Sequence, residues 1–222
     1  MGGRGQSYTR KSKQSKTTST NQKQETKHYE FTRYDDEKIE SVQQRTGMNY
    51  DEAAKTVKAI GEWSTSAYGE IRTIQQGKTP TWLPKDAIEH YKNAINDLET
   101  FIDRAPKWAG GTMYRGIKVD AATLNKYMQV GAIYAENALT SFTTNEKNAQ
   151  GFSVSYDENR PHRVVFKTTS KTTKHGASIT RETRMRDEDE VLMSSKAKFR
   201  IKRATEKRDA HGVYYQIDIT EI

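Results

Sequence analysis

The spacing of hydrophobic residues changes once along this chain, close to Gly110 and Gly111. Before these glycines, apolar residues recur every three or four positions, as on one face of a helix. After them, apolar and polar residues alternate, as in a half-buried strand. Helices followed by strands are typical of an α+β domain, whereas βαβ units would alternate the two types along the whole chain. The pattern therefore predicts an α+β domain with a mainly helical part at residues 35–108 and a strand-rich part at 109–222.

Four helices are expected before the two glycines. The strongest helical pattern covers residues 88–102, where five apolar residues recur at spacings of 3, 4, 3 and 4. An earlier helix should begin near Asp35 and end near Gly47, because acidic residues open it and a glycine follows its apolar face. The two remaining helices should flank the polar interruption at residues 63–66, and Asn49 or Asp51 should cap the first of them.

Five short strands are expected beyond the glycines. Phe199 and Ile201 alternate with basic residues, so their strand should bury one face and expose a basic one. A helix over Ala121–Met128 should follow the first strand. The expected strands cover residues 112–117, 163–168, 190–193, 198–205 and 213–220.

The net charge of +8 is concentrated at the amino end. Residues 1–34 hold eight lysines and arginines against two glutamates, a net charge of +6 that leaves only +2 for the rest of the chain. Met1 and Tyr8 are the large apolar residues of its first 27 positions, too few to offset the entropy lost on ordering them. We therefore expect a disordered basic tail at 1–34, either solvated or bound to a nucleic acid or an acidic partner, and one domain at 35–222.

Composition excludes several kinds of site. The chain contains no cysteine, which excludes disulfides, thiolate metal sites and cysteine nucleophiles. Its five histidines show neither an i, i+4 pair nor a cysteine partner, so we expect no metal. No apolar run is long enough for a membrane span, and no secretory signal is visible. We therefore expect a cytoplasmic, monomeric protein with no membrane partner.

Two segments of the strand-rich half carry polar groups in unusual settings. In Thr112–Ile117 the alternation places Arg115 on an apolar face, where a guanidinium needs either a structural carboxylate or a phosphate as its partner. The adjacent Gly116 would suit a phosphate. Leu139–Asn145 is rich in hydroxyl groups, a composition typical of turns at strand ends.

A third segment is acidic and leads directly into an apolar strand at residues 187–193. Glu188 and Glu190 are two positions apart, so in extended backbone both side chains point to the same side. There the domain could hold Glu190 while Glu188 faces outward. Taken alone, the segment also fits an exposed acidic turn.

In this order the three segments resemble the arginine, serine/threonine and Glu-x-Glu motifs of mono-ADP-ribosyltransferases of the actin- and arginine-modifying toxin type. The resemblance spans roughly residues 50–222 and includes the helices before the motifs. The chain has Ser141-Phe142-Thr143 where these enzymes have Ser-Thr-Ser, and the first hydroxyl is retained. The resemblance implies N-terminal helices packed on a mixed, mostly antiparallel two-sheet β core.

The resemblance also implies that NAD is the substrate, that nicotinamide is released and that ADP-ribose passes to an arginine of an acceptor protein. Glu190, held in place by Ser141, would offset the positive charge that develops on the ribose. Glu188 would prepare the arginine for attack. The residues expected to bind NAD are Arg115 at the phosphates, Gly116 at the carboxamide, Ser141, Thr143, and Phe152, which is either a stacking surface or a core residue.

We interpret the protein as a toxin effector or a bacteriophage-encoded modifier of host proteins. Three arginines at residues 181–186 favour an acceptor whose exposed arginine lies on an acidic surface, or self-modification. Two other functions remain open: an NAD glycohydrolase whose acceptor is water, and a non-catalytic protein on a decayed transferase fold whose tail binds nucleic acid or a capsid.

We predict that about the first 30 residues can be removed without loss of NAD consumption, because they contain almost nothing to bury. A chain that begins at residue 31 should fold and release nicotinamide at the rate of the full-length protein. A truncated chain that fails to fold would place the domain boundary elsewhere.

Overall fold

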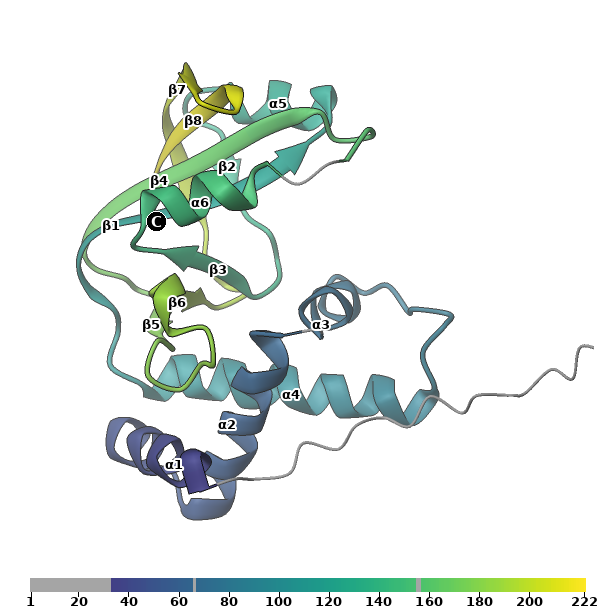
Figure 1. Cartoon of the computed structure of the whole chain (residues 1–222), viewed down its shortest axis with the longest axis vertical. Helices are drawn as coiled ribbons and strands as arrows, with labels where there is room; N and C mark the ends of the chain where they lie inside the picture. Colours follow the sequence, from purple (N-terminus) through teal and green to yellow (C-terminus); the bar gives the residue numbers. More distant parts are fainter. Residues whose placement is uncertain (1–32, 66, 155–156) are drawn as a thin grey trace, which may run out of the picture. The chain divides into compact units, whose positions relative to one another are not determined.

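The computed structural model describes residues 33–65, 67–154 and 157–222 (Figure 1). The predicted tail therefore lies almost entirely outside the described residues. Six helices and eight strands follow one another in the described part. The helices are α1 (Arg33–Thr46), α2 (Tyr50–Trp63), α3 (Tyr68–Gln75), α4 (Lys85–Arg104), α5 (Ala121–Tyr127) and α6 (Glu146–Phe152).

Local sequence signals account for the ends of the first helices. Asn49 caps α2: its side chain accepts a hydrogen bond from the backbone nitrogen of Glu52 at 3.0 Å, while Glu52 accepts one from the backbone nitrogen of Asn49 at 3.1 Å. Helix α4 begins directly after Pro84 and ends directly before Ala105 and Pro106. The four helices predicted before the glycines are all present. None of the helices in the described part is both long and apolar enough to cross a bilayer.

The eight strands form one mixed sheet in the order β2-β7-β8-β4-β1-β3-β6-β5. Strands β4 and β8 are parallel, and the other neighbouring pairs are antiparallel. The strands are β1 (Ala109–Val119), β2 (Ile133–Tyr134), β3 (Thr140–Thr143), β4 (His162–Thr172), β5 (Gly176–Ser178), β6 (Glu190–Met193), β7 (Phe199–Asp209) and β8 (Gly212–Glu221).

A single register pair, Tyr114 with Thr143, joins β1 to β3. In contrast, β1 pairs with β4 along its whole length, from Ala109 to Val119. The sheet therefore consists of a five-stranded part (β2, β7, β8, β4, β1) and a three-stranded part (β3, β6, β5) that meet at one pair. The α+β class predicted from the sequence is confirmed, and the two expected sheets are these two parts of one continuous sheet.

The three-stranded part lies between two hydrophobic cores, because its residues alternate between its two faces. Leu192 of β6 faces the core that includes Leu98 of α4. Its neighbours Val191 and Met193 belong to the second core, which includes Phe166 of the five-stranded part. Helix α6 packs against the other face of β1 and β4 through Ala149 and Val165 (Figure 1). The helices α1, α2 and α4 thus cover the three-stranded part, whereas α6 covers the five-stranded part.

The hydroxyl-rich segment 139–145 corrects one expectation. Residues 140–143 form strand β3 between β1 and β6, and turn chemistry is confined to its end, where the hydroxyl of Thr143 accepts a hydrogen bond from the backbone nitrogen of Asn145 and Asn145 caps α6. Thr140 and Phe142 are buried in this strand. Pairing with two distant strands, which local composition does not reveal, overrides the turn preference of the hydroxyl groups.

Leu192→Ala should destabilise the protein by about 2–5 kcal/mol, because this fully buried side chain joins the helices to the three-stranded part. Urea unfolding measures the loss. Val130→Ala is the control, because Val130 is 67% exposed and its truncation should have little effect. Equal effects of the two changes would mean that this interface does not limit stability.

Candidate active site

The carboxylate of Glu190, the first residue of β6, is buried and has two donors. Its Oε1 accepts a hydrogen bond from Trp63 Nε1 at 2.9 Å and another from the hydroxyl of Ser141. Trp63 Nε1 also lies 3.0 Å from Ser141 Oγ. The end of α2, the middle of β3 and the start of β6 therefore converge on one oxygen atom. The structure shows the contact between Ser141 and Glu190 that the resemblance implied and adds Trp63 to it.

The environment of Glu190 shifts its acidity. Burial raises the pKa of the carboxyl group, and the hydrogen bonds from Ser141 and Trp63 and the charge of Arg115 oppose that rise without cancelling it. Burial also raises the pKa of Glu188, and the nearby charges of Glu190 and Asp187 raise it further. Two carboxyl groups with raised pKa values in one cleft are typical of functional sites.

Arg115 lies on β1, and the protein satisfies only part of its hydrogen-bonding capacity. Nη1 donates to the carbonyl oxygen of Ser141 at 3.1 Å, and Nη2 lies 3.8 Å from Glu136 Oε1. Nε is buried without a partner among the described residues. The sequence predicted either a structural carboxylate or a phosphate as the partner of this guanidinium. The structure places the carboxylate of Glu136 beside it and leaves the Nε donor without a partner in the described part.

Glu136 holds several groups together beside Arg115. It accepts hydrogen bonds from Arg72 Nη2 at 2.6 Å and from the hydroxyl of Tyr134 at 2.7 Å. Burial acts to raise the pKa of Glu136, but Arg115 and Arg72 outweigh it and leave the pKa below its ordinary value. Neither Glu136 nor Arg72 was predicted as a site residue, because no motif marks them and they are 64 positions apart.

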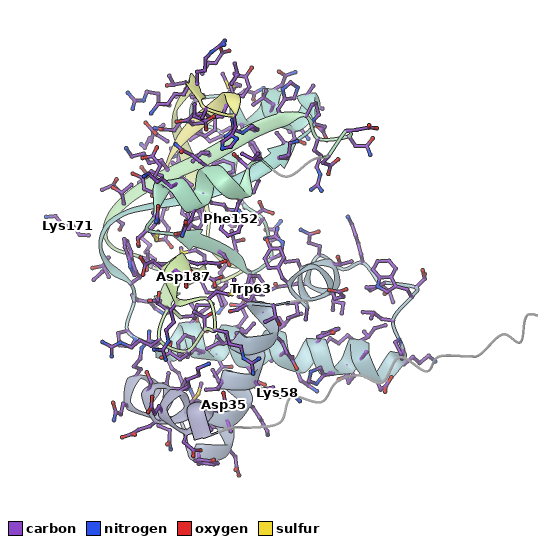
Figure 2. All side chains as sticks on the ribbon, viewed as in Figure 1. Asp35, Lys58, Trp63, Phe152, Lys171 and Asp187 are labelled. Carbon is purple, nitrogen blue, oxygen red and sulfur yellow. The ribbon has the colours of Figure 1, made fainter. Side chains whose placement is uncertain are left out.

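A cleft of about 760 Å³ connects these groups. This volume lies within the range of small-molecule sites, about 300–1,000 Å³. Figure 2 labels Trp63 and Phe152, which both line the cleft, Trp63 from α2 and Phe152 from α6. All seven site residues predicted from the sequence line it: Arg115, Gly116, Ser141, Thr143, Phe152, Glu188 and Glu190.

Two of these residues have clear structural settings. A Cβ atom on Gly116 would lie 1.6 Å from the carbonyl oxygen of Ala149, so the close packing of α6 on β1 requires glycine here. This packing alone explains why glycine occupies position 116, without the contact to the nicotinamide carboxamide that the resemblance implied. Phe152 is 53% exposed, which excludes the alternative that it is a core residue.

The segment before Glu190 differs from the expected extended backbone. Residues Arg186–Glu188 form a 3₁₀ turn, and Asp189 adopts a left-handed conformation with φ of 46°. The prediction that Glu188 and Glu190 share one side of a strand is therefore wrong, although both line the cleft. Thr143 donates a hydrogen bond to the carbonyl oxygen of Glu188, and this contact, made by β3, fixes the turn.

We find no protein-family model and no curated protein sequence that matches the chain. Solved structures do match. Vis toxin, an ADP-ribosyltransferase from Vibrio splendidus, is 25% identical over 84% of this chain and 82% of its own, with a TM-score of 0.63. The chain has the ADP-ribosyltransferase fold. The mono-ADP-ribosyltransferase resemblance drawn from the sequence is thereby confirmed.

Two further transferases share this fold at lower identity. ADP-ribosyltransferase HopU1 of Pseudomonas syringae pv. tomato is 20% identical, covers 77% of each chain and has a TM-score of 0.58. Exoenzyme S of Pseudomonas aeruginosa, solved with human 14-3-3 protein beta and carba-NAD, is 13% identical over 84% of this chain and 88% of its own, with a TM-score of 0.55. Within the described part of this transferase fold, no group of three or more histidines and carboxylates is placed to hold a metal ion.

Glu190→Gln should stabilise the protein at about pH 7 and have no effect at about pH 3. Burial raises the folded pKa of Glu190 above its ordinary value of 4.5, so the wild type loses stability as the pH rises through that raised value. Below the ordinary value, the carboxyl is protonated in both states and resembles the amide. Urea unfolding of both proteins across this range measures the difference. A variant less stable than the wild type at the higher pH would show that the donors more than offset burial.

Proposed function

We propose that the protein transfers ADP-ribose from NAD to an arginine side chain of an acceptor protein and releases nicotinamide. The observation that carries this proposal is the Glu190 carboxylate, fixed by Trp63 and Ser141 in a cleft that Arg115 and Glu188 also line. The ADP-ribosyltransferase fold supports the same chemistry. Residues 35–222 are the proposed catalytic domain.

The residues of the cleft fit NAD. Arg115 has a buried N–H without a partner in the described part, and Arg72 and Arg160 bring two more guanidinium groups to the lining. These cations suit the pyrophosphate of a dinucleotide. The exposed ring of Phe152 offers an apolar face for the nicotinamide or the ribose.

Glu190 supplies electrostatic stabilisation in this proposal. NAD contributes nicotinamide as a leaving group that is already cationic, so no general acid is required. A carboxylate held rigidly beside the ribose favours the positive charge that develops there. Trp63 and Ser141 share one oxygen of Glu190 and leave Oε2 for the ribose hydroxyls. The fixed donors keep the carboxylate oriented without reorganisation during the reaction.

Glu188 prepares the acceptor. An arginine side chain is fully protonated in water, so a nearby carboxylate is needed to orient it and to accept its proton as it attacks. Burial and the neighbouring carboxylates raise the pKa of Glu188, which makes it a better proton acceptor than an exposed glutamate. Vis has been solved in complex with agmatine, whose guanidinium group is that of arginine.

The proposal extends to the setting of the reaction. We propose a cytoplasmic, monomeric effector or phage-encoded modifier that acts on a host protein. The arginines at positions 181, 184 and 186 favour an acceptor with an acidic surface around its target arginine. In this proposal the basic tail contacts a nucleic acid or an acidic partner.

Exchanging the two glutamates for glutamine separates their roles. Glu190→Gln should lower both nicotinamide release and ADP-ribosyl-arginine formation by at least about 10²-fold, because it removes the charge that stabilises the reacting ribose. Glu188→Gln should leave most nicotinamide release and abolish transfer to arginine. Both products are measured by mass spectrometry after incubation with NAD and a cell lysate.

The outcomes also test the alternatives. Nicotinamide release with no labelled protein in the wild type would identify an NAD glycohydrolase. A wild type that consumes no NAD and binds nucleic acid in a salt-dependent way through residues 1–34 would identify a non-catalytic protein. Equal loss of both activities in Glu188→Gln would refute the arginine assignment.

A further inference from the structure

Helix α1 contacts the segment that precedes Glu188 through a buried ion pair. The carboxylate of Glu182 is fully buried, and its Oε1 accepts hydrogen bonds from Ser41 Oγ at 2.7 Å and from Arg45 Nη1 at 2.8 Å. Arg45 Nη2 also donates to the carbonyl oxygen of Ser178 at 2.8 Å. Ser41 and Arg45 are four residues apart, on one face of α1. We call Ser41, Arg45 and Glu182 the α1 anchor.

Helix α1 does not need the α1 anchor to bury its apolar side chains. Ile39 and Val42 already pack α1 into the hydrophobic core. A buried ion pair adds little net stability, because desolvation of the charges offsets much of their attraction. Such a pair instead favours one arrangement of the groups that it joins, since any other arrangement leaves a buried charge without its partner. The α1 anchor therefore fixes where the backbone at Glu182 lies.

Short-range hydrogen bonds connect Glu182 to Glu188. Backbone nitrogens of residues 182 and 183 donate to the carbonyl of Ile179 at 3.0 and 2.8 Å. The backbone nitrogen of Met185 donates to the hydroxyl of Thr183 at 3.1 Å, and that of Glu188 donates to the carbonyl of Met185 at 3.1 Å. These turns restrict the movement of the backbone between the α1 anchor and Glu188. The position of Glu182 consequently limits the position of Glu188.

The side chain of Glu190 is held by other contacts, although its backbone carbonyl accepts a hydrogen bond from the backbone nitrogen of Ile179 at 3.0 Å. Its donors come from α2 and β3, and neither belongs to the α1 anchor. A change in the α1 anchor should therefore affect Glu188 more than the carboxylate of Glu190, which Trp63 and Ser141 still hold. This separation allows the two carboxylates to be perturbed to different degrees.

We infer that Ser41, Arg45 and Glu182 are positioning residues that hold Glu188 toward the acceptor arginine. They govern the transfer of ADP-ribose and take no part in nicotinamide release. The inference rests on the proposed function, and specifically on the role of Glu188 as the group that prepares the acceptor.

Arg45→Met tests the inference. Transfer to agmatine should fall at least about tenfold, because a displacement of about 1 Å in a reacting group is enough for such a loss. Nicotinamide release without acceptor should change by less than about twofold. Trypsin should cleave faster after the arginines at positions 181, 184 and 186, because the segment is held less firmly. The cleavage rate reports on the segment independently of activity.

Two milder variants and a matched control complete the experiment. Arg45→Lys keeps the charge but loses the fork that joins Glu182 to Ser178, and Ser41→Ala removes a single donor. Both should lower the ratio of transfer to nicotinamide release less than Arg45→Met does, and they carry the test if that variant fails to fold. In the control, Arg163→Met removes a comparable buried pair with Asp209, whose two contacts measure 2.8 and 2.7 Å. The control should lose stability and keep the wild-type ratio.

Different experimental results would overturn the inference and the proposed function. If the wild type modifies agmatine and the α1 anchor variants keep its ratio, or lose both activities equally, the α1 anchor is only structural and the inference is overturned. If the wild type releases no nicotinamide, the proposed function is wrong and the inference falls with it.

Discussion

The arrangement of the cleft depends on the burial of one carboxylate, that of Glu190. A buried carboxylate is costly unless donors surround it, and here Trp63 and Ser141 donate to the same oxygen. Trp63 ends α2, Ser141 lies in β3 and Glu190 begins β6. The donors converge only when the helices have packed on the three-stranded part of the sheet. The interface between the helices and the sheet, which includes Leu192, therefore also determines the geometry of the cleft.

The single pair between β1 and β3 explains why both parts of the sheet contribute to the cleft. Tyr114 pairs with Thr143, and Thr143 in turn pairs with Glu190. Arg115 follows Tyr114, so one register pair brings the arginine and the glutamate of the cleft close together. Among the described residues, no other register pair joins the two parts of the sheet. Residues of β1, β3 and β6 therefore face a common cavity.

Periodicity predicts the elements that bury a continuous apolar face. The helix at 88–102 and the strands at 198–205 and 213–220 lie within α4, β7 and β8 for this reason. Strand β3 was missed because its hydroxyl groups favour turns, and Trp63 because its partner Glu190 lies 127 positions away. The turn at Arg186–Glu188 was expected only as the alternative to an extended strand, because contacts of β3 and α6 with the carbonyl oxygens of Glu188 and Asp187 hold it. The predicted site residues nevertheless line one cleft. They could be predicted because the order of the three motifs along the chain is more specific than any one of the short motifs.

Glu188 and Glu190 are close in sequence but are held by different sets of contacts. Glu190 belongs to a buried strand and is held by α2 and β3, so its position is tied to the core of the domain. Glu188 ends a turn that β3 holds through Thr143, and the segment before this turn is held by α1 at Glu182. Under the proposed function, a substitution in the turn or in α1 can therefore alter the approach of an acceptor more than it alters the Glu190 site. In the proposed function, the core fixes the Glu190 site that acts on NAD, and the turn with Glu188 is the part in which acceptor choice can vary.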